Sequence, residues 1–133
     1  FVIVKLLTAE ETCAALTGTL RTPIFEAVFH EGQLHATDRA ALRTFNSDGG
    51  LVEELWSLNG NRARLDGGPY LTRFDSTGGI IEQRWNNGAG DEHRDGDLPA
   101  CISARGLEWC QNGKRSRAAG KPAWIGEGTV FSD

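Results

Sequence analysis

The chain lacks several patterns that whole classes of protein require. No apolar run approaches the roughly 20 residues of a membrane-spanning helix, and the apolar stretch 1–7 is short and carries Lys5. No C-x-x-C pair occurs, which argues against a structural zinc site. The three cysteines, Cys13, Cys101 and Cys110, are too few for a disulfide framework. Methionine is absent, so we interpret the chain as a processed or excised piece of something longer.

Basic charge and catalytic motifs are scarce too. The 133 residues, enough for one small domain, carry a net charge of −4, which argues against nucleic-acid binding. The basic stretch Lys114–Lys121 is typical of a solvated face. Neither a G-x-S-x-G motif nor a Walker loop is present. Residues 91–97 resemble a calcium loop, but His93 and Ile102 stand where oxygen ligands belong. We therefore expect no metal, no cofactor and no enzyme activity.

One sequence motif occurs three times along the chain. Each copy has a tryptophan, then an Asn-Gly pair, and then a proline, and the tryptophans Trp56, Trp85 and Trp109 are 29 and then 24 residues apart. An eroded copy, Val28–Ala41, precedes them without the tryptophan or the proline. Self-similarity at this period indicates stacked repeat units, an architecture that works mostly through its surface.

Strand and turn signals predict an all-β fold, an antiparallel meander of stacked β-hairpins. Short apolar runs alternate with turns, and Asn-Gly is the strongest short hairpin signal. Turns are expected at two sets of positions: Asn59-Gly60, Asn87-Gly88 and Asn112-Gly113, and, before each tryptophan strand, Asp48-Gly49, Thr77-Gly78 and Arg105-Gly106. We expect about four units over residues 23–133, the first degenerate.

The N-terminal part, residues 1–22, is expected to form a separate cap. Thr8 and Glu11 have the spacing of a capping box, which predicts a helix near 9–17, and Gly18 suits the left-handed position after it. Residues 1–7 read as a short strand. Such a helix would cover the edge of the first unit, since the ends of a repeat array need closing.

The repeat positions supply the candidate binding residues. Each tryptophan is expected to cover one sheet face and stack on its equivalent in the next unit. The arginines Arg64, Arg94 and Arg117 hold one position of the repeat. They either stack over a tryptophan or pair with a neighbouring carboxylate, or they form a stripe that binds an anion or a partner. A histidine precedes the arginine only at His93; Ala63 and Ser116 replace it elsewhere.

The spacing of two cysteines suggests that they are close in space. If Arg105-Gly106 is a two-residue turn, Cys101 faces Cys110 in a non-hydrogen-bonded pair, with Cα atoms about 4.5 Å apart. A disulfide can bridge that distance, and whether it forms depends on the compartment.

The residue pattern of the repeat resembles that of the MORN-variant repeat family. The resemblance rests on the run from Asn87 to Ile102, with its Asn-Gly, His-Arg, Asp-Gly and Pro-Ala pairs, and on W-x-x-N-G-K-x-x-R at Trp109 to Arg117. That family occurs in tandem in bacterial antitoxin-like proteins and in large DNA viruses of amoebae. It implies an antiparallel sheet of stacked hairpins and roles in scaffolding or binding, with no common enzyme activity.

We therefore expect a non-catalytic protein that offers a sheet face to another protein or to itself. A viral assembly, and a cytoplasmic or virion-associated location, are favoured by the resemblance. The alternative is a small-molecule or carbohydrate-binding module that uses tryptophan and arginine on one face. Tryptophans buried between layers favour the first function, and tryptophans lining an open groove favour the second.

Overall fold

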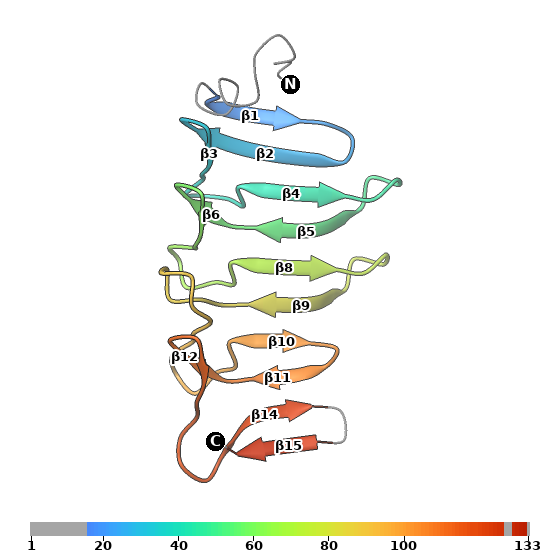
Figure 1. Ribbon diagram of the computed structural model, residues 1–133. Helices are drawn as coiled ribbons and strands as arrows, with labels where there is room; N and C mark the ends of the chain where they lie inside the picture. The colour runs from blue at the N-terminus through green and yellow to red at the C-terminus, as the bar shows by residue number, and fades with distance from the viewer. Residues whose placement is uncertain (1–15, 127–128, 133) are drawn as a thin grey trace.

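The computed structural model describes residues 16–126 and 129–132, and every regular element in this part of the chain is a β-strand. The predicted all-β class is confirmed. Ten strands follow one another in chain order across one antiparallel sheet, and β3 pairs with β2 beside it (Figure 1). The ten are β1 (Gly18–Arg21), β2 (Phe25–His30), β4 (Leu42–Phe45), β5 (Leu51–Leu55), β8 (Leu71–Phe74), β9 (Ile80–Arg84), β10 (Cys101–Ser103), β11 (Gly106–Glu108), β14 (Pro122–Gly126) and β15 (Thr129–Ser132).

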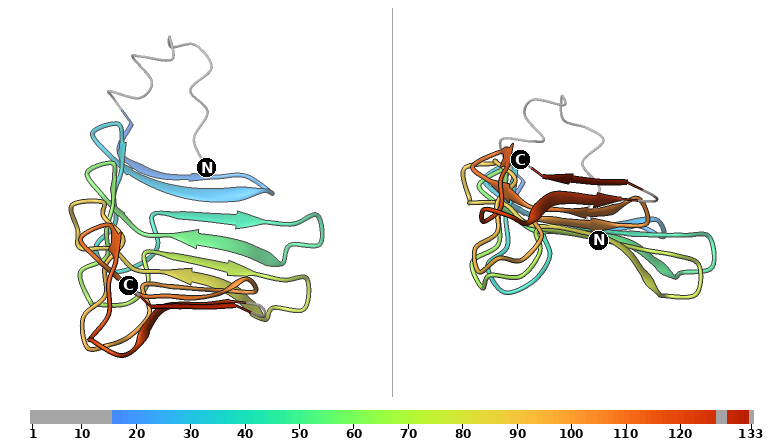
Figure 2. Two further views of the ribbon diagram at one scale, coloured as in Figure 1. Left: turned by 60° about the horizontal axis from the view of Figure 1, so that its bottom comes forward. Right: turned by 90° about the horizontal axis from the view of Figure 1, so that it is seen from below.

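A small hairpin follows each of the first four pairs of long strands, at the same end of the sheet (Figures 1 and 2). The first is formed by the end of β2 with β3 (Gln33–Leu34), the second by β6 (Ser57–Leu58) and β7 (Asn61–Arg62). The third is a loop closed by a bridge between Asn86 and Glu92, and the fourth is formed by β12 (Cys110–Gln111) and β13 (Lys114–Arg115). A unit is thus a two-stranded arm, a small hairpin and a loop that returns the chain to the sheet.

The small hairpins turn at residues that tolerate positive φ. Asn59-Gly60 (φ 50° and 82°) and Asn112-Gly113 (51° and 85°) have positive φ at both central positions, as a type I′ turn requires. Glu31-Gly32 (49° and 81°) makes a turn of the same kind, which its sequence did not reveal. At Asn87-Gly88 only the glycine has positive φ, and the Asn87 N–H instead donates to the Asp91 carbonyl at 3.0 Å.

The uneven spacing of the tryptophans comes from the arms. Tyr70 and Trp85 are 15 positions apart, whereas Ala100 and Trp109 are only 9 apart. The difference arises because β10 and β11 are joined by a two-residue turn, while β8 and β9 are joined by a longer loop and carry an irregular register at their outer end. The arms β4–β5 and β8–β9 therefore reach beyond β10–β11 (Figure 1).

The core lies where the sheet meets the small hairpins. The backbone N–H of each repeat tryptophan donates at 2.7–2.8 Å to a carbonyl on the next strand, in the pairs Trp56 to Tyr70, Trp85 to Ala100 and Trp109 to Ala123. Both alanines are fully buried, and their small side chains leave room for the indole rings. Successive tryptophans are two strand spacings apart, about 10 Å, with Tyr70 or Ala100 between them. The expected stacking of tryptophan on tryptophan is therefore wrong.

Beyond this core the sheet is a single layer (Figure 2). In this layer, opposite charges face one another across neighbouring strands. The Arg43 Nε lies 3.5 Å from Glu54, and its Nη1 lies 4.0 Å from Glu26. On the opposite face Arg73 lies 3.5 Å from Glu53 and 3.4 Å from Glu82. Opposite charges on neighbouring strands stabilise the pairing modestly and keep both faces of a one-layer sheet hydrated.

The short strand expected over residues 1–7 lies outside the described residues. The predicted helix over 9–17 lies outside the described residues, except for Leu16 and Thr17, which are not helical. Gly18, expected to follow that helix, instead begins β1, which pairs with β2 along its whole length. The sheet thus starts at Gly18 rather than at residue 23.

The predicted pairing of Cys101 with Cys110 is wrong by two residues. Ser103 pairs with Gly106, so Cys101 faces Glu108. Gly106 (φ 145°) is a strand residue that lets the β14 backbone approach, since a Cβ there would lie 2.2 Å from the Ile125 carbonyl oxygen. Cys101 and Cys110 are both free and buried, and Cys13 lies outside the described residues.

We predict that Cys101 and Cys110 react slowly with thiol reagents in the folded protein. Burial raises the pKa of both thiols, that of Cys110 to about 12, and the thiolate is the reactive form. In a Cys13→Ser background, labelling by Ellman's reagent at about pH 8 should be on the order of 100-fold slower in the folded protein than in urea. An intramolecular disulfide formed by air oxidation of the folded chain would contradict this expectation.

Candidate functional site

An arginine covers the ring face of each repeat tryptophan. The arginine Cζ lies 3.9, 3.7 and 3.7 Å from the ring centroid in the pairs Arg64–Trp56, Arg94–Trp85 and Arg117–Trp109. At this distance the guanidinium is held by a cation–π interaction. Its Nη1 also donates to the carbonyl of the proline five residues later, at 3.1–3.2 Å, in the pairs Arg64 to Pro69, Arg94 to Pro99 and Arg117 to Pro122. The three arginines thus hold the same position in three successive units.

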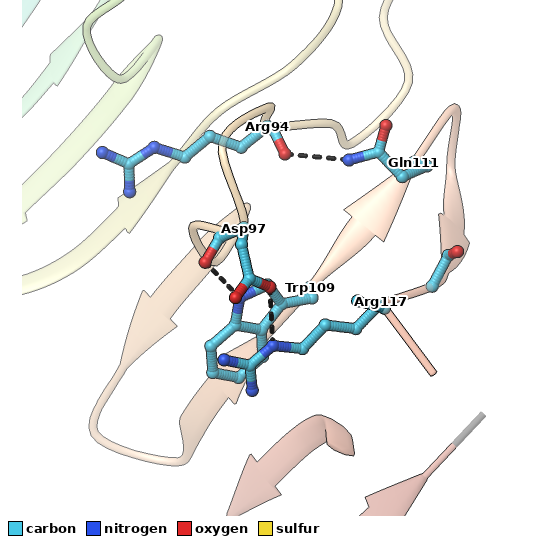
Figure 3. Close-up of a pocket in the computed structure, with 7 residues that line it drawn as sticks. Arg94, Asp97, Trp109, Gln111 and Arg117 are labelled. Carbon is cyan, nitrogen blue, oxygen red and sulfur yellow. Dashed lines mark hydrogen bonds and ion pairs between the residues drawn. The ribbon is translucent and has the colours of Figure 1, made fainter. Parts of the chain in front are cut away.

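Aspartates complete two of these three sites. Arg117 Nε donates to Asp97 of the preceding unit at 2.9 Å (Figure 3). Lys121 reaches the same carboxylate at 2.8 Å. These two hydrogen bonds lower the pKa of Asp97 to about 2. Arg64 binds Asp66 of its own loop at 2.6 Å. No described carboxylate binds Arg94, and burial lowers the pKa of its guanidinium.

The ring faces of the tryptophans are consequently covered by arginine rather than open to solvent. Trp85 and Trp109 are 7% and 6% exposed, and Trp56 is half-buried. The Trp109 indole N–H is also used, since it donates to the Asp97 carbonyl at 3.1 Å. Stacking of arginine on tryptophan, one of the arrangements that the sequence left open, is therefore what the structure shows.

Two histidines join successive small hairpins. His93 Nδ1 accepts the backbone N–H of Asn112 at 3.1 Å, and His35 Nδ1 accepts that of Asn59 at 3.0 Å. Of these two histidines, only His93 was identified from the repeat pattern. His35 lies seven residues after Val28, as Ala63 does after Trp56 and Ser116 after Trp109. That fixed offset was the signal that could have identified it.

The junctions between small hairpins are not all alike. Three hydrogen bonds recur at the first junction (first to second hairpin) and at the last junction (third to fourth hairpin). In the first, the N–H of the turn asparagine donates to His Nδ1. In the second, the N–H of the turn glycine donates to a carbonyl at 2.9 Å, from Gly60 to Leu34 and from Gly113 to Glu92. The third joins Ala36 N–H to the Ser57 carbonyl at 3.1 Å at the first junction, and Arg94 N–H to the Cys110 carbonyl at 3.3 Å at the last. At the middle junction, between the second and third hairpins, none of the three is found in the described chain. The Asn86 side chain donates to the Arg62 carbonyl at 2.7 Å instead.

Two cavities open on the hairpin layer. One, of about 340 Å³, is lined by Arg94, Asp97, Trp109, Gln111 and Arg117, whose polar groups mostly bind one another (Figure 3). Gln111, for example, donates to the Arg94 carbonyl at 2.9 Å. The other, of about 550 Å³, lies at the middle junction. The first cavity, whose polar groups are already paired, offers little to a polar ligand.

A polar pair ties the third hairpin to the sheet. The Tyr70 hydroxyl donates to Glu92 Oε1 at 2.8 Å, and Arg84 Nη1 lies 3.6 Å from the same oxygen. Burial, together with the Glu92 carboxylate, raises the pKa of Tyr70 to about 12. The tyrosine is therefore held neutral at the sheet–hairpin boundary.

The described residues show no metal cluster, and the histidine at the last junction has both ring nitrogens hydrogen-bonded. Within 16–126 and 129–132 no three or more His, Cys, Asp or Glu side chains are grouped to hold a metal ion. Both ring nitrogens of His93 are occupied, Nδ1 by Asn112 and Nε2 by Asp95 at 2.9 Å. No helix in the same part of the chain is long and apolar enough to cross a membrane.

Fold and site together define an all-β protein with one meandering sheet and a layer of arginine-capped hairpins at one end. No protein-family model, curated protein or solved structure matches the chain.

We predict that His93→Ala destabilises the fold by about 1 kcal/mol, because the Asn112 N–H loses its acceptor. His35→Ala should have a similar effect through Asn59. Urea denaturation measures both, and the exposed His30→Ala is the control, with an expected change within about 0.5 kcal/mol. Equal effects of all three substitutions would show that the two histidines do not couple the hairpins.

We predict that Tyr70 makes stability fall at alkaline pH. Its pKa is higher folded (about 12) than unfolded (10.0), so its contribution is complete below pH 10 and is lost as the pH rises through 12. Thermal unfolding between pH 9 and pH 12 should show a steeper loss for the native chain than for Tyr70→Phe. Parallel curves would show that the hydroxyl does not titrate differently in the two states.

Proposed function

We propose that this chain is a non-catalytic repeat protein whose sheet face binds other proteins, in scaffolding or assembly. The observation that carries this proposal is the apolar end of the arms. Ile24, Ile80 and Ile81 are 62%, 57% and 45% exposed. The apolar residues Phe45, Leu51 and Phe74 lie at the same end of the arms, since the Phe45 N–H donates to the Ile24 carbonyl, Phe45 pairs with Leu51, and Phe74 pairs with Ile80. We take these residues together as a candidate apolar patch, because exposed apolar patches are typical of interaction surfaces.

Charge favours a protein partner over a polyanion. Arg43 and Arg73, which precede Phe45 by two residues and Phe74 by one, each lie between two glutamates, so they offer little net charge to a phosphate backbone. The partner is another protein or a second copy of this chain. The resemblance to the MORN-variant repeats supports the same class of function and, by the same analogy, a viral assembly as its setting.

The alternative, a small-molecule or carbohydrate module built on tryptophan and arginine, has less support. Such a module needs an open aromatic platform. Here the arginines occupy the ring faces of Trp56, Trp85 and Trp109, and their Nη1 atoms are bound to proline carbonyls. The sheet face is thus the better candidate for recognition.

We predict that a photo-crosslinking residue at Ile24 or Ile81 captures one defined protein, or a second copy of the chain, in the cells or particles that contain it. The same residue at the exposed Ala118, on the hairpin side, is the matched control and should capture nothing specific. Adding Ile80→Lys to the Ile81 probe should weaken the capture at least about tenfold, since it places a charge in the apolar patch. Equal capture from all three positions, or none from any, would refute a binding role for the sheet face.

A further inference from the structure

The middle junction leaves two backbone groups without the partners that their equivalents have. At the last junction the Arg94 N–H donates to the Cys110 carbonyl, and at the first junction the Ala36 N–H donates to the Ser57 carbonyl. The corresponding groups at the middle junction are the Arg64 N–H and the Asn86 carbonyl. No described residue bonds to either of them.

Two local differences keep this junction open. Ala63 stands where His35 and His93 place an imidazole, so it can accept no N–H from the next hairpin. The third hairpin also has one more residue, since His93 follows Trp85 by eight positions and Ala63 follows Trp56 by seven. The extra length lets the Asn87 N–H bond to Asp91 within its own loop, away from the second hairpin.

The space between the hairpins is a cleft of about 550 Å³. One wall is apolar and consists of Leu58, Ala63 and Leu65, and the last of these is 70% exposed. The Arg64 guanidinium faces Asp66 and the Pro69 carbonyl, so it cannot readily take an anion. Both nitrogens of His93 are used as well. What remains is the Arg64 N–H as a backbone donor, the Asn86 carbonyl as a backbone acceptor, the apolar wall and the exposed Asp95 carboxylate.

We propose that this cleft binds the main chain of an extended polypeptide segment. A carbonyl of the segment accepts the Arg64 N–H, one of its N–H groups donates to the Asn86 carbonyl, and an apolar side chain packs against Leu58, Ala63 and Leu65. A peptide supplies all three features at once, and strand addition to unpaired backbone groups is a common mode of peptide recognition. The proposal goes beyond the proposed function, because the cleft lies in the hairpin layer and would add a contact separate from the arm ends.

The test uses a neutral blocked tripeptide, acetyl-Ala-Leu-Ala-N-methylamide, titrated into the isotopically labelled full chain and followed by amide NMR. We expect saturable shifts of the Arg64 amide and its neighbours, with a dissociation constant on the order of 1 mM. Ala63→His, which restores the imidazole of the other junctions, should weaken binding at least about tenfold. Ser116→His places the same residue at the same repeat position beyond the cleft and should bind as the native chain does.

A second variant tests the proposal independently, in case Ala63→His fails to fold. Leu65 is largely exposed, so Leu65→Asp leaves the fold intact and should weaken binding by a similar factor. The absence of saturable shifts up to about 20 mM peptide would overturn the cleft proposal, as would undiminished binding to both variants. The proposed function is judged separately by capture at Ile24 and Ile81. Capture there without peptide binding would leave the sheet-face function standing and remove the cleft.

Discussion

The arginine that lies on each repeat tryptophan is the interaction on which the rest of this structure depends. A unit must turn out of the sheet, form a small hairpin and return to the sheet. The guanidinium closes this turn by binding the indole face on one side and the next proline carbonyl on the other. Proline lacks an N–H, so its carbonyl is its only backbone hydrogen-bonding group, and here it serves to align the incoming strand.

The sheet is covered by small hairpins at one end and is a single layer at the other, and these two halves are stabilised differently. Near the hairpins, buried alanines and tryptophans form a narrow core. In the arms, cross-strand pairs such as Arg43–Glu54 and Arg73–Glu82 replace a second layer. Each such pair is weak, because it is exposed and screened by solvent. The arms therefore depend on the core end for their register, and they are free to differ in length.

Local pattern predicts much of this fold and little of its fine register. Asn59-Gly60 and Asn112-Gly113 predict turns because few other residue pairs tolerate positive φ at both positions. The two-residue turn predicted at Arg105-Gly106 was wrong because glycine is used both in turns and where two backbones approach closely. Gly106 serves the close approach. The recurrence of Arg64, Arg94 and Arg117 identified the important position, and stacking over a tryptophan was one of the arrangements that it left open. The open middle junction arises from backbone groups of different units, and no short-range pattern specifies their distance.

The substitution of a single imidazole by a methyl group at Ala63 also has a consequence for cooperativity. Stability in a repeat array is approximately a sum of terms for each unit and for each contact between neighbours. The first two hairpins share one set of bonds, the last two share an equivalent set, and the contact between these pairs is different and sparser. The hairpin layer is therefore divided into two blocks, joined mainly by the continuous sheet. Under stress such an array would lose its structure block by block rather than in one transition, with the boundary at Ala63.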